Sequence, residues 1–223
     1  MGSFIVFEGC EGVGKSTQLK FIEEYVKKTN QKVLFTREPG GTPLAEEIRK
    51  IILTKDMAPE TEAALFAAAR VDHINNFLKP KLEEGYTIIC DRYIDSSLAY
   101  QGIARNLGFD RVKEINKYAL DNMMPDCVIF LDLSPENAWR RKSGIVVEND
   151  RIDNESLEFH KEVFKGYSML AETETRFIKI KPEVDKLDTH IKIVNALRER
   201  KLLDWLILRL LKIVMHLKIL SAM

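Results

Sequence analysis

A glycine-rich segment near the start of the chain constrains the fold more than any other feature. Residues 9–17 read G-C-E-G-V-G-K-S-T, which fits the pattern G-x-x-x-x-G-K-[ST]. An apolar run over residues 3–8 precedes the segment, and a stretch with apolar residues at helical spacing follows it from Lys15. A strand, a glycine turn and a helix are the context in which this pattern holds phosphate. We therefore expect a nucleotide-binding α/β domain.

The residue types of this loop explain why it suits phosphate. Its glycines let successive backbone N–H groups point into one concavity at a helix N-terminus, where partial positive charge favours an anion. Lys15 is expected to reach the outer phosphates, and the Ser16 hydroxyl is expected to take one position on Mg²⁺. The residues assigned to the cradle are Gly9, Cys10, Glu11, Gly12, Val13, Gly14, Lys15, Ser16 and Thr17.

The rest of the chain alternates strand-like and helical stretches. Apolar runs typical of buried parallel strands lie at residues 32–36, 86–90, 127–131 and 176–180. Helical stretches separate them, among them residues 15–28, 44–53 and 63–84. This alternation predicts a five-stranded parallel sheet with helices on both faces, in one domain that spans residues 1–201.

Composition narrows the choice of partner and compartment. Lys and Arg number 34, as do Asp and Glu, so the net charge is zero and a nucleic-acid partner is disfavoured. The three cysteines, Cys10, Cys90 and Cys127, are odd in number and lie in or beside apolar runs. They indicate reduced thiols and a cytoplasmic location, and no signal peptide is apparent at the N-terminus.

A phosphate loop alone does not distinguish an enzyme from a nucleotide switch. A GTPase-like switch would also carry Asn-Lys-x-Asp to read guanine, but the Asn-Lys pair at 116–117 is followed by Tyr-Ala. Nor does Asp132, after the fourth predicted strand, open an Asp-x-x-Gly. The switch is therefore the less favoured reading.

A kinase for small molecules must hold its acceptor opposite the donor loop, and arginines grip anionic acceptors bidentately. Four arginines lie near predicted strand ends or on the intervening helices: Arg37, Arg49, Arg70 and Arg92. Arg92 is the best placed, because Asp91 and Arg92 directly follow a buried strand. The Asp91 carboxylate could hold Mg²⁺ directly or through a water molecule.

Six blocks of the sequence resemble the thymidylate kinase family. They are GCEGVGKST at 9–17, TREPGGTPLAEEIR from Thr36, LFAAARVDH from Leu65, DRYIDSSLAYQG from Asp91, PDCVIFLDLSPE from Pro125 and DRIDNES from Asp150. The resemblance implies a P-loop kinase fold and transfer of the γ-phosphoryl group of ATP to dTMP, with Mg²⁺ and usually as a homodimer. The nearest alternative is another nucleoside monophosphate kinase, for dUMP or UMP.

The resemblance also assigns roles at the acceptor base. Phe66 would stack on thymine, and Arg70, one helical turn later, would hydrogen-bond the base edge. Spacing independently allows this pair, since positions i and i+4 share a helix face. Ser97 and Gln101 would line the same base pocket.

The sugar and phosphate of the acceptor have their own implied contacts. Arg92 would bind the dTMP phosphate, with Arg49 as a second clamp. Glu11 would face the 3′-hydroxyl, and Tyr100 would close the space that a ribose 2′-hydroxyl needs. The Glu38-Pro39 bond is implied to be cis.

Residues 140–153 are the candidate lid, a basic, loop-like segment before a helix expected near residue 155. Because Gly12 follows Glu11, the resemblance implies that the catalytic arginine comes from this lid. The segment RRKSGIVVEND departs from the family pattern, since its basic residues precede Gly144 and apolar residues follow it. Arg141 and Arg151 therefore both stand as catalytic candidates, alongside Lys15, Asp91 and Arg92.

Residues 202–223 form a mostly apolar extension beyond the part that resembles the family. Charges at Asp204, Arg209, Lys212 and Lys218 disfavour a membrane crossing. The spacing predicts a basic amphipathic helix. Packing on the domain is favoured over contact with a dimer partner or a membrane surface.

Overall fold

The chain forms a five-stranded parallel sheet, as the alternation of strands and helices predicts. The computed structural model describes residues 2–120, 123–142 and 150–202. The strand order is β2-β3-β1-β4-β5, so the chain crosses over the sheet several times. The strands are β1 (Phe4–Glu8), β2 (Val33–Arg37), β3 (Thr87–Asp91), β4 (Cys127–Leu131) and β5 (Phe177–Ile180).

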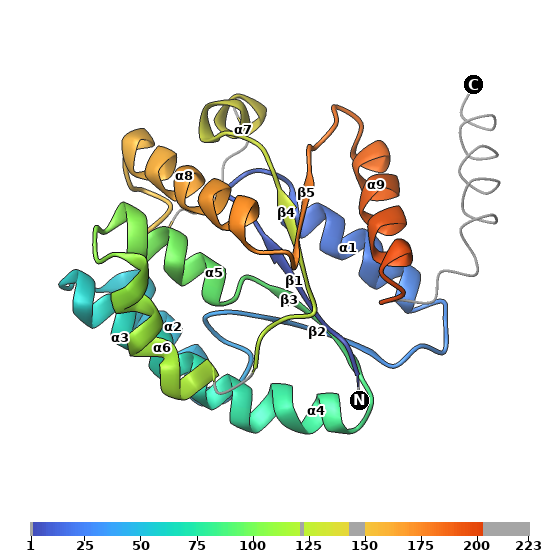
Figure 1. The fold of residues 1–223 in the computed structure, drawn as a ribbon, viewed down its shortest axis with the longest axis horizontal. Helices are drawn as coiled ribbons and strands as arrows, with labels where there is room; N and C mark the ends of the chain where they lie inside the picture. The colour runs from blue at the N-terminus through green and yellow to red at the C-terminus, as the bar shows by residue number, and fades with distance from the viewer. Residues whose placement is uncertain (1, 121–122, 143–149, 203–223) are drawn as a thin grey trace.

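Helices cover the sheet on both faces, which explains why its central strands are mostly apolar. Every residue of β1 and β4 is buried. Helices α1 (Lys15–Val26) and α9 (Lys186–Glu199) lie on one side of the sheet in Figure 1. The opposite side carries α5 (Ile94–Ser97), the π-helical η2 (Leu98–Ala104) and α8 (Leu157–Thr173).

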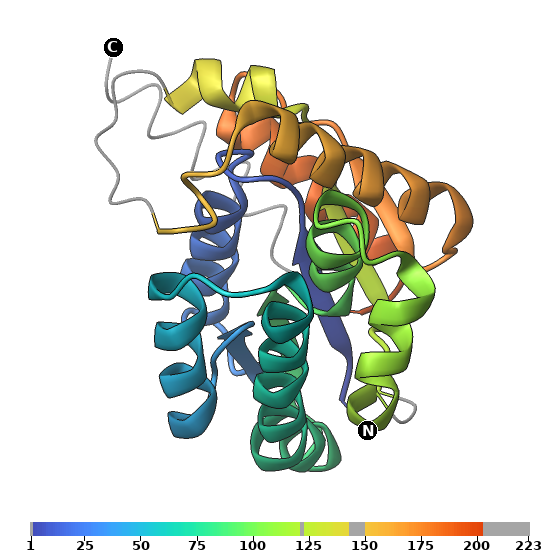
Figure 2. The same ribbon diagram turned by 90° about the vertical axis from the view of Figure 1, so that its left-hand side faces the viewer.

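A further group of helices packs beside the sheet and supplies one wall of the site. Helix α2 (Pro43–Thr54) contacts α3 (Pro59–His73), which in turn contacts α6 (Phe109–Leu120). Figure 2 shows α2 and α3 side by side. The helical stretch predicted over residues 63–84 begins earlier, at Pro59, because proline suits the first turn of a helix. It continues through the π-helical η1 (Ile74–Leu78) into α4 (Lys79–Glu83).

The candidate lid differs from its sequence prediction at its start. Arg140, Arg141 and Lys142 form the last turn of helix α7 (Pro135–Lys142), so the basic triplet is helical and not part of a loop. Pro135 opens this helix at a position that proline favours. Residues 143–149 of the predicted lid and residues 203–223 of the extension lie outside the described residues.

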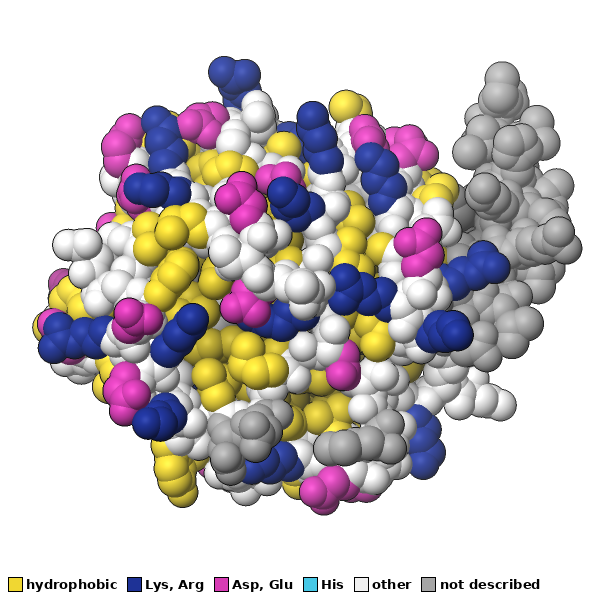
Figure 3. Space-filling model, in the orientation of Figure 1, with side chains coloured by type: hydrophobic (Ala, Val, Ile, Leu, Met, Phe, Trp, Pro, Cys, Tyr) yellow, Lys and Arg dark blue, Asp and Glu magenta, His cyan; other side chains and the backbone are white. Residues whose placement is uncertain are grey.

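The described surface mixes charges of both signs. Figure 3 shows Lys and Arg side chains interspersed with Asp and Glu over the face it draws. Cys10, Cys90 and Cys127 are free thiols and all three are buried. Within residues 2–120, 123–142 and 150–202, none of the helices is long and apolar enough to cross a bilayer.

Candidate active site

The glycine-rich segment forms a tight loop between β1 and α1. Gly9 has φ 141° and Gly14, the residue that caps α1, has φ 102°. Residues that carry a Cβ atom rarely adopt such backbone angles. A Cβ atom on Gly9 would also lie 3.0 Å from the carbonyl oxygen of Leu131. The Lys15 ammonium donates to the carbonyl oxygens of Gly9 (3.0 Å) and Cys10 (3.1 Å). The loop therefore has the form that the sequence predicts for a phosphate cradle.

A pocket with about 80 Å³ of space accessible to water molecules adjoins this loop. Six of the eight residues predicted to bind the acceptor line it: Glu11, Arg49, Phe66, Arg92, Tyr100 and Gln101. The remaining lining residues are Glu38, Pro39, Leu53, Ser96, Asp150, Ile152 and Asp153. The pocket thus collects side chains from the phosphate loop, α2, α3, η2 and residues 150–153 at the end of the candidate lid.

Arg92 is held at the wall of this pocket by several contacts. Its backbone takes the left-handed conformation with φ 70°, which is uncommon for a residue with a side chain. Its guanidinium donates to the Ser96 hydroxyl (3.1 Å) and to the Tyr167 hydroxyl (2.9 Å), and it pairs with Glu11 of the phosphate loop. It also lies 5.2 Å from the centre of the Tyr100 ring.

Glu8, a residue that the sequence analysis did not single out, lies close to the Arg92 guanidinium. Its buried carboxylate accepts hydrogen bonds from the backbone of Tyr93 (2.9 Å), the Ser96 hydroxyl (2.7 Å) and the Tyr167 hydroxyl (2.7 Å). The Arg92 guanidinium lies 3.9 Å from it. Burial raises the pKa of Glu8 to about 7, although the charge of Arg92 opposes the rise. A carboxylate ending an apolar strand was the available signal in the sequence.

Arg70 and Ser97 lie behind the pocket and are not among its lining residues. The Arg70 side chain is 1% exposed. Its guanidinium donates to Glu38 (2.8 Å), to Ser97 (3.1 Å) and to Asn116. The resemblance assigns Arg70 to the base edge; of its three partners here, Glu38 lines the pocket, and Ser97 and Asn116 do not.

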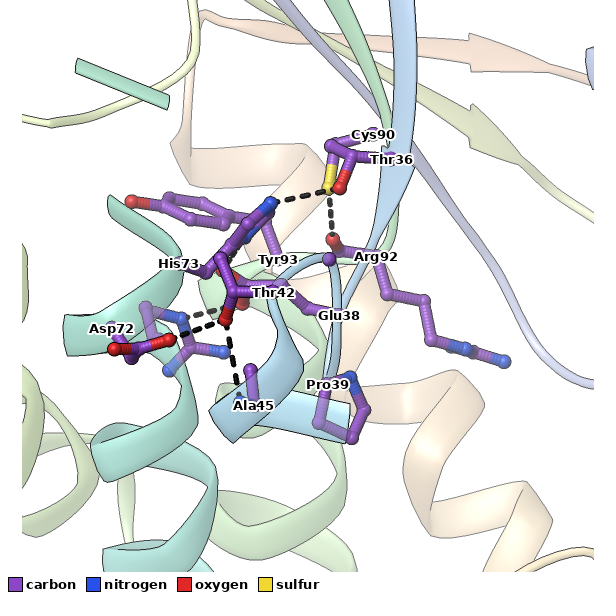
Figure 4. A network of polar contacts seen from close by, with 12 residues as sticks. Thr36, Glu38, Pro39, Thr42, Ala45, Asp72, His73, Cys90, Arg92 and Tyr93 are labelled. Carbon is purple, nitrogen blue, oxygen red and sulfur yellow. Dashed lines mark hydrogen bonds and ion pairs between the residues drawn. The ribbon is translucent and has the colours of Figure 1, made fainter. Parts of the chain in front are cut away.

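A polar network ties the turn after β2 to α3. The Glu38-Pro39 bond is cis, as expected. Glu38 is 3.0 Å from the near ring nitrogen of His73, whose other ring nitrogen is 2.8 Å from the Thr36 hydroxyl. Figure 4 shows this network, with the Arg92 side chain extending away from it. Glu38 and Pro39 are thereby fixed as part of the pocket wall.

Asp91 and Ser16, the predicted Mg²⁺ residues, line a second, open hollow, whose other lining residues come largely from α1 and β2. Asp91 ends β3, and its Oδ1 atom is buried without a hydrogen-bond partner. An unpartnered carboxylate oxygen and a hydroxyl that line the same hollow suit a hard cation that takes oxygen ligands. These two residues therefore fit Mg²⁺.

The two candidate lid arginines point to different neighbours. Arg141 donates to the carbonyl oxygen of Pro182 (3.3 Å). Arg151 donates to the carbonyl oxygen of Ile52 (3.1 Å) and to the Glu62 carboxylate (2.6 Å). Neither lines the acceptor pocket, although Asp150 and Ile152, on either side of Arg151, do.

Comparison with known proteins agrees with the geometry. The family model described as thymidylate kinase matches residues 7–193. A thymidylate kinase from Symbiobacterium thermophilum is 46% identical over 183 residues, which cover 81% of this chain and 85% of the relative. One from Clostridium novyi is 45% identical over 198 residues, covering 86% and 97%. One from Thermoanaerobacter sp. is 40% identical over 201 residues, covering 89% and 98%.

Proposed function

This chain belongs to the thymidylate kinase family, and from that membership we infer that it is an ATP:dTMP phosphotransferase that forms dTDP. One observation carries the proposal at the level of the site. Glu11 belongs to the phosphate loop, lines the acceptor pocket and pairs with Arg92 from the opposite wall. The donor cradle and the acceptor pocket therefore adjoin, as transfer between two bound nucleotides requires.

The chemistry is mainly a problem of charge. Two phosphate-bearing substrates repel one another, so the enzyme must supply positive charge where the transferred group spreads its negative charge. Lys15 supplies it at the donor loop, and Arg92 supplies it at the acceptor. Arg49, on α2, lines the same pocket and would be the second clamp on the dTMP phosphate. When dTMP enters, its phosphate would compete with Glu11 for Arg92.

The apolar and amide side chains of the pocket would hold the rest of dTMP. Phe66 presents its ring to the pocket, where it would stack on thymine, and Gln101 lies beside it as a polar contact. Tyr100 is buried against Arg92 and would fill the space of a ribose 2′-hydroxyl. These side chains would therefore favour a nucleotide whose base can stack on Phe66 and whose sugar lacks a 2′-hydroxyl group.

The family uses ATP and generally Mg²⁺. We propose that residues 9–17 hold the ATP phosphates, and that Ser16 and Asp91 hold Mg²⁺ directly or through water. Bound Mg²⁺ would neutralise charge on the ATP phosphates. The catalytic arginine of the lid, Arg141 or Arg151, is proposed to approach the transferred group when both nucleotides are bound.

Release of ADP with separate acceptors tests the proposed activity. The protein is mixed with ATP, Mg²⁺ and one of dTMP, dUMP, UMP or dCMP, and ADP is measured against time. We expect dTMP to give the largest kcat/KM. A preference for dUMP or UMP would assign the protein to another nucleoside monophosphate kinase activity. Slow hydrolysis of nucleotide without any acceptor would instead support a GTPase-like switch.

We propose that residues 1–201 form the catalytic unit of a cytoplasmic homodimer. Free buried thiols support the location. Exposed apolar side chains on α2 and α6 support an interface there: Leu44, Ile51 and Tyr118. Light scattering after gel filtration should give twice the mass of the chain.

A further inference from the structure

Glu62 lies at a junction between the acceptor pocket and the end of the candidate lid. It is on α3, and its side chain is 2% exposed. Its carboxylate accepts hydrogen bonds from the Gln101 amide nitrogen (2.9 Å), from Arg151 (2.6 Å) and from Arg105 (3.3 Å). Arg105 pairs in turn with Glu155 at 2.6 Å. A single buried carboxylate thus joins a pocket residue to two arginines.

The two arginines keep Glu62 charged. Burial acts to raise the pKa of Glu62, but the hydrogen bonds from Gln101 and Arg151 and the charge of Arg105 outweigh it, and the pKa is lowered. An ionised carboxylate has no hydrogen to donate and can only accept. Any side chain that hydrogen-bonds to Glu62 must therefore do so through an N–H or O–H group.

This requirement fixes the orientation of Gln101. Its amide can face Glu62 only through the NH₂ group, so the carbonyl oxygen Oε1 must face the other way. That oxygen is buried and has no hydrogen-bond partner, and Gln101 lines the acceptor pocket. A buried acceptor without a partner costs free energy unless a bound ligand supplies a donor.

We propose that Glu62 is a positioning residue for base selectivity: by holding the NH₂ group of Gln101, it makes Gln101 present only a hydrogen-bond acceptor to the base. A base with a ring N–H donor at the facing position, as in thymine or uracil, satisfies that acceptor. Cytosine presents a ring nitrogen acceptor there, and two acceptors would face each other. The proposal rests on the proposed function, because it needs a pyrimidine nucleotide in this pocket.

The near-isosteric variant Glu62→Gln tests this role. A glutamine at position 62 can keep its oxygen toward Arg151 and turn its NH₂ group toward Gln101, with loss of the longer hydrogen bond (3.3 Å) that Arg105 Nε donates to the same atom of Glu62. The Gln101 amide would then rotate and present its own NH₂ group to the base. The acceptor pair is dTMP and 5-methyl-dCMP, which share the methyl group and differ in the ring hydrogen-bonding edge. The readout is the ratio of their kcat/KM values.

We expect wild-type protein to favour dTMP strongly, because a site built to hydrogen-bond one group discriminates against an analogue that leaves it unpaired. The ratio should fall at least about tenfold in Glu62→Gln, through loss with dTMP and gain with 5-methyl-dCMP. Asp95→Asn is the matched control. Asp95 is also buried and paired with an arginine, Arg176, at 2.6 Å, but it makes no hydrogen bond to Gln101, so its substitution should leave the ratio unchanged.

A second variant keeps the test decisive if Glu62→Gln does not fold. Gln101→Glu sets a carboxyl group against Glu62, and the two groups would share one proton between them. The outer oxygen of the new carboxyl group would still offer the base an acceptor, so the ratio should stay within about threefold of the wild-type value even if both nucleotides bind more weakly. A collapse of the ratio in this variant would show that a donor faces the base, which would overturn the proposal.

An unchanged ratio in folded Glu62→Gln would also overturn it. Failure of the wild-type protein to phosphorylate dTMP is a different result, because it would refute the proposed function itself. Wild-type activity on dTMP together with an unchanged ratio in Glu62→Gln would refute only the role of Glu62.

Discussion

The two halves of the candidate cleft are built in different ways. The donor half is one continuous segment, residues 9–17, whose shape depends on the backbone conformations of its glycines. Its lysine donates hydrogen bonds to carbonyl oxygens of the same loop. The acceptor half draws Arg49, Phe66, Gln101 and Asp153 from segments far apart in the sequence. A local loop can be predicted from a short pattern, whereas a composite pocket depends on the whole fold.

The halves also differ in how their charges are balanced. Lys15 contacts neutral carbonyl groups, so a phosphate would meet an ammonium that no carboxylate of the described residues pairs with. Arg92 contacts Glu11 and lies close to Glu8, and Arg151 contacts Glu62. Ligand binding at the acceptor half must therefore exchange ion pairs, which makes that half more sensitive to pH and to single substitutions.

The largest expected effect comes from the candidate lid arginine. Arg151→Ala should lower kcat by about 10³-fold or more if Arg151 stabilises charge in the transition state. The KM for dTMP should stay nearly constant, because such a contact forms chiefly in the transition state. Steady-state kinetics would be compared with those of Arg141→Ala. Unchanged turnover in Arg151→Ala would remove Arg151 from the mechanism and leave it as the anchor to Glu62.

The next effect tests the donor half. Lys15→Ala should lower kcat by about 10²- to 10³-fold, as expected for loss of one positive group at the transferred phosphoryl group. Calorimetry should show that dTMP still binds with nearly wild-type affinity, since Lys15 does not line the acceptor pocket. A large loss of dTMP affinity would mean that the two halves are not separable in this way.

Arg92 gives the converse test at the acceptor half. Arg92→Met should raise the KM for dTMP by about 10²-fold, because a buried, hydrogen-bonded charge partner costs about 2–5 kcal/mol when it is removed. The KM for ATP should change far less. Equal effects on both substrates would show that Arg92 acts on the donor as well. Thermal unfolding of the variant serves as the control for folding.

The smallest expected effect is on stability and concerns the titration of Glu8. Its pKa is raised from 4.5 to about 7 by burial, so the folded protein keeps a proton that the unfolded chain releases between these values. The contribution of Glu8 to stability is therefore fully present below about pH 4.5 and falls as the pH rises to about 7. Glu8→Gln should lack this fall, which amounts to up to about 3 kcal/mol.

Urea unfolding of both proteins between pH 4 and pH 8 measures the difference. The free energy of unfolding of the wild type should decline relative to that of Glu8→Gln as the pH rises. Parallel curves would mean that Glu8 titrates normally.

Sequence predicted the sheet and the donor loop well, because both depend on local patterns. The apolar run at Cys127–Leu131 is strand β4 with the same bounds, and β3 covers residues 87–91, one residue later than the predicted run at 86–90. The i, i+4 spacing put Phe66 and Arg70 on one helix face, but Phe66 lines the pocket and Arg70 does not. Glu38 and Asn116, distant in sequence, hold the Arg70 guanidinium behind it.

The networks around Glu8 and Glu62 were beyond sequence reasoning for the same reason. The partners of Glu8 include Tyr167, which is 159 positions away, and Glu62 meets Arg151 across 89 positions. The position of a glutamate at the end of an apolar strand or within a helix does not indicate which distant residues donate hydrogen bonds to it. The basic triplet at 140–142 was misplaced because its charge suggested a loop, whereas the helix that starts at Pro135 continues through it.

The most direct test of the central claim uses a dinucleotide in which adenosine and thymidine are joined through five phosphates. If the donor loop and the acceptor pocket form one cleft, both ends bind at once and the linkage raises affinity without any new contact. Titration calorimetry should show one molecule bound per chain, tighter than ATP or dTMP alone and displaceable by either nucleotide. Binding no tighter than that of the better single nucleotide, with displacement by only one of them, would contradict a shared cleft.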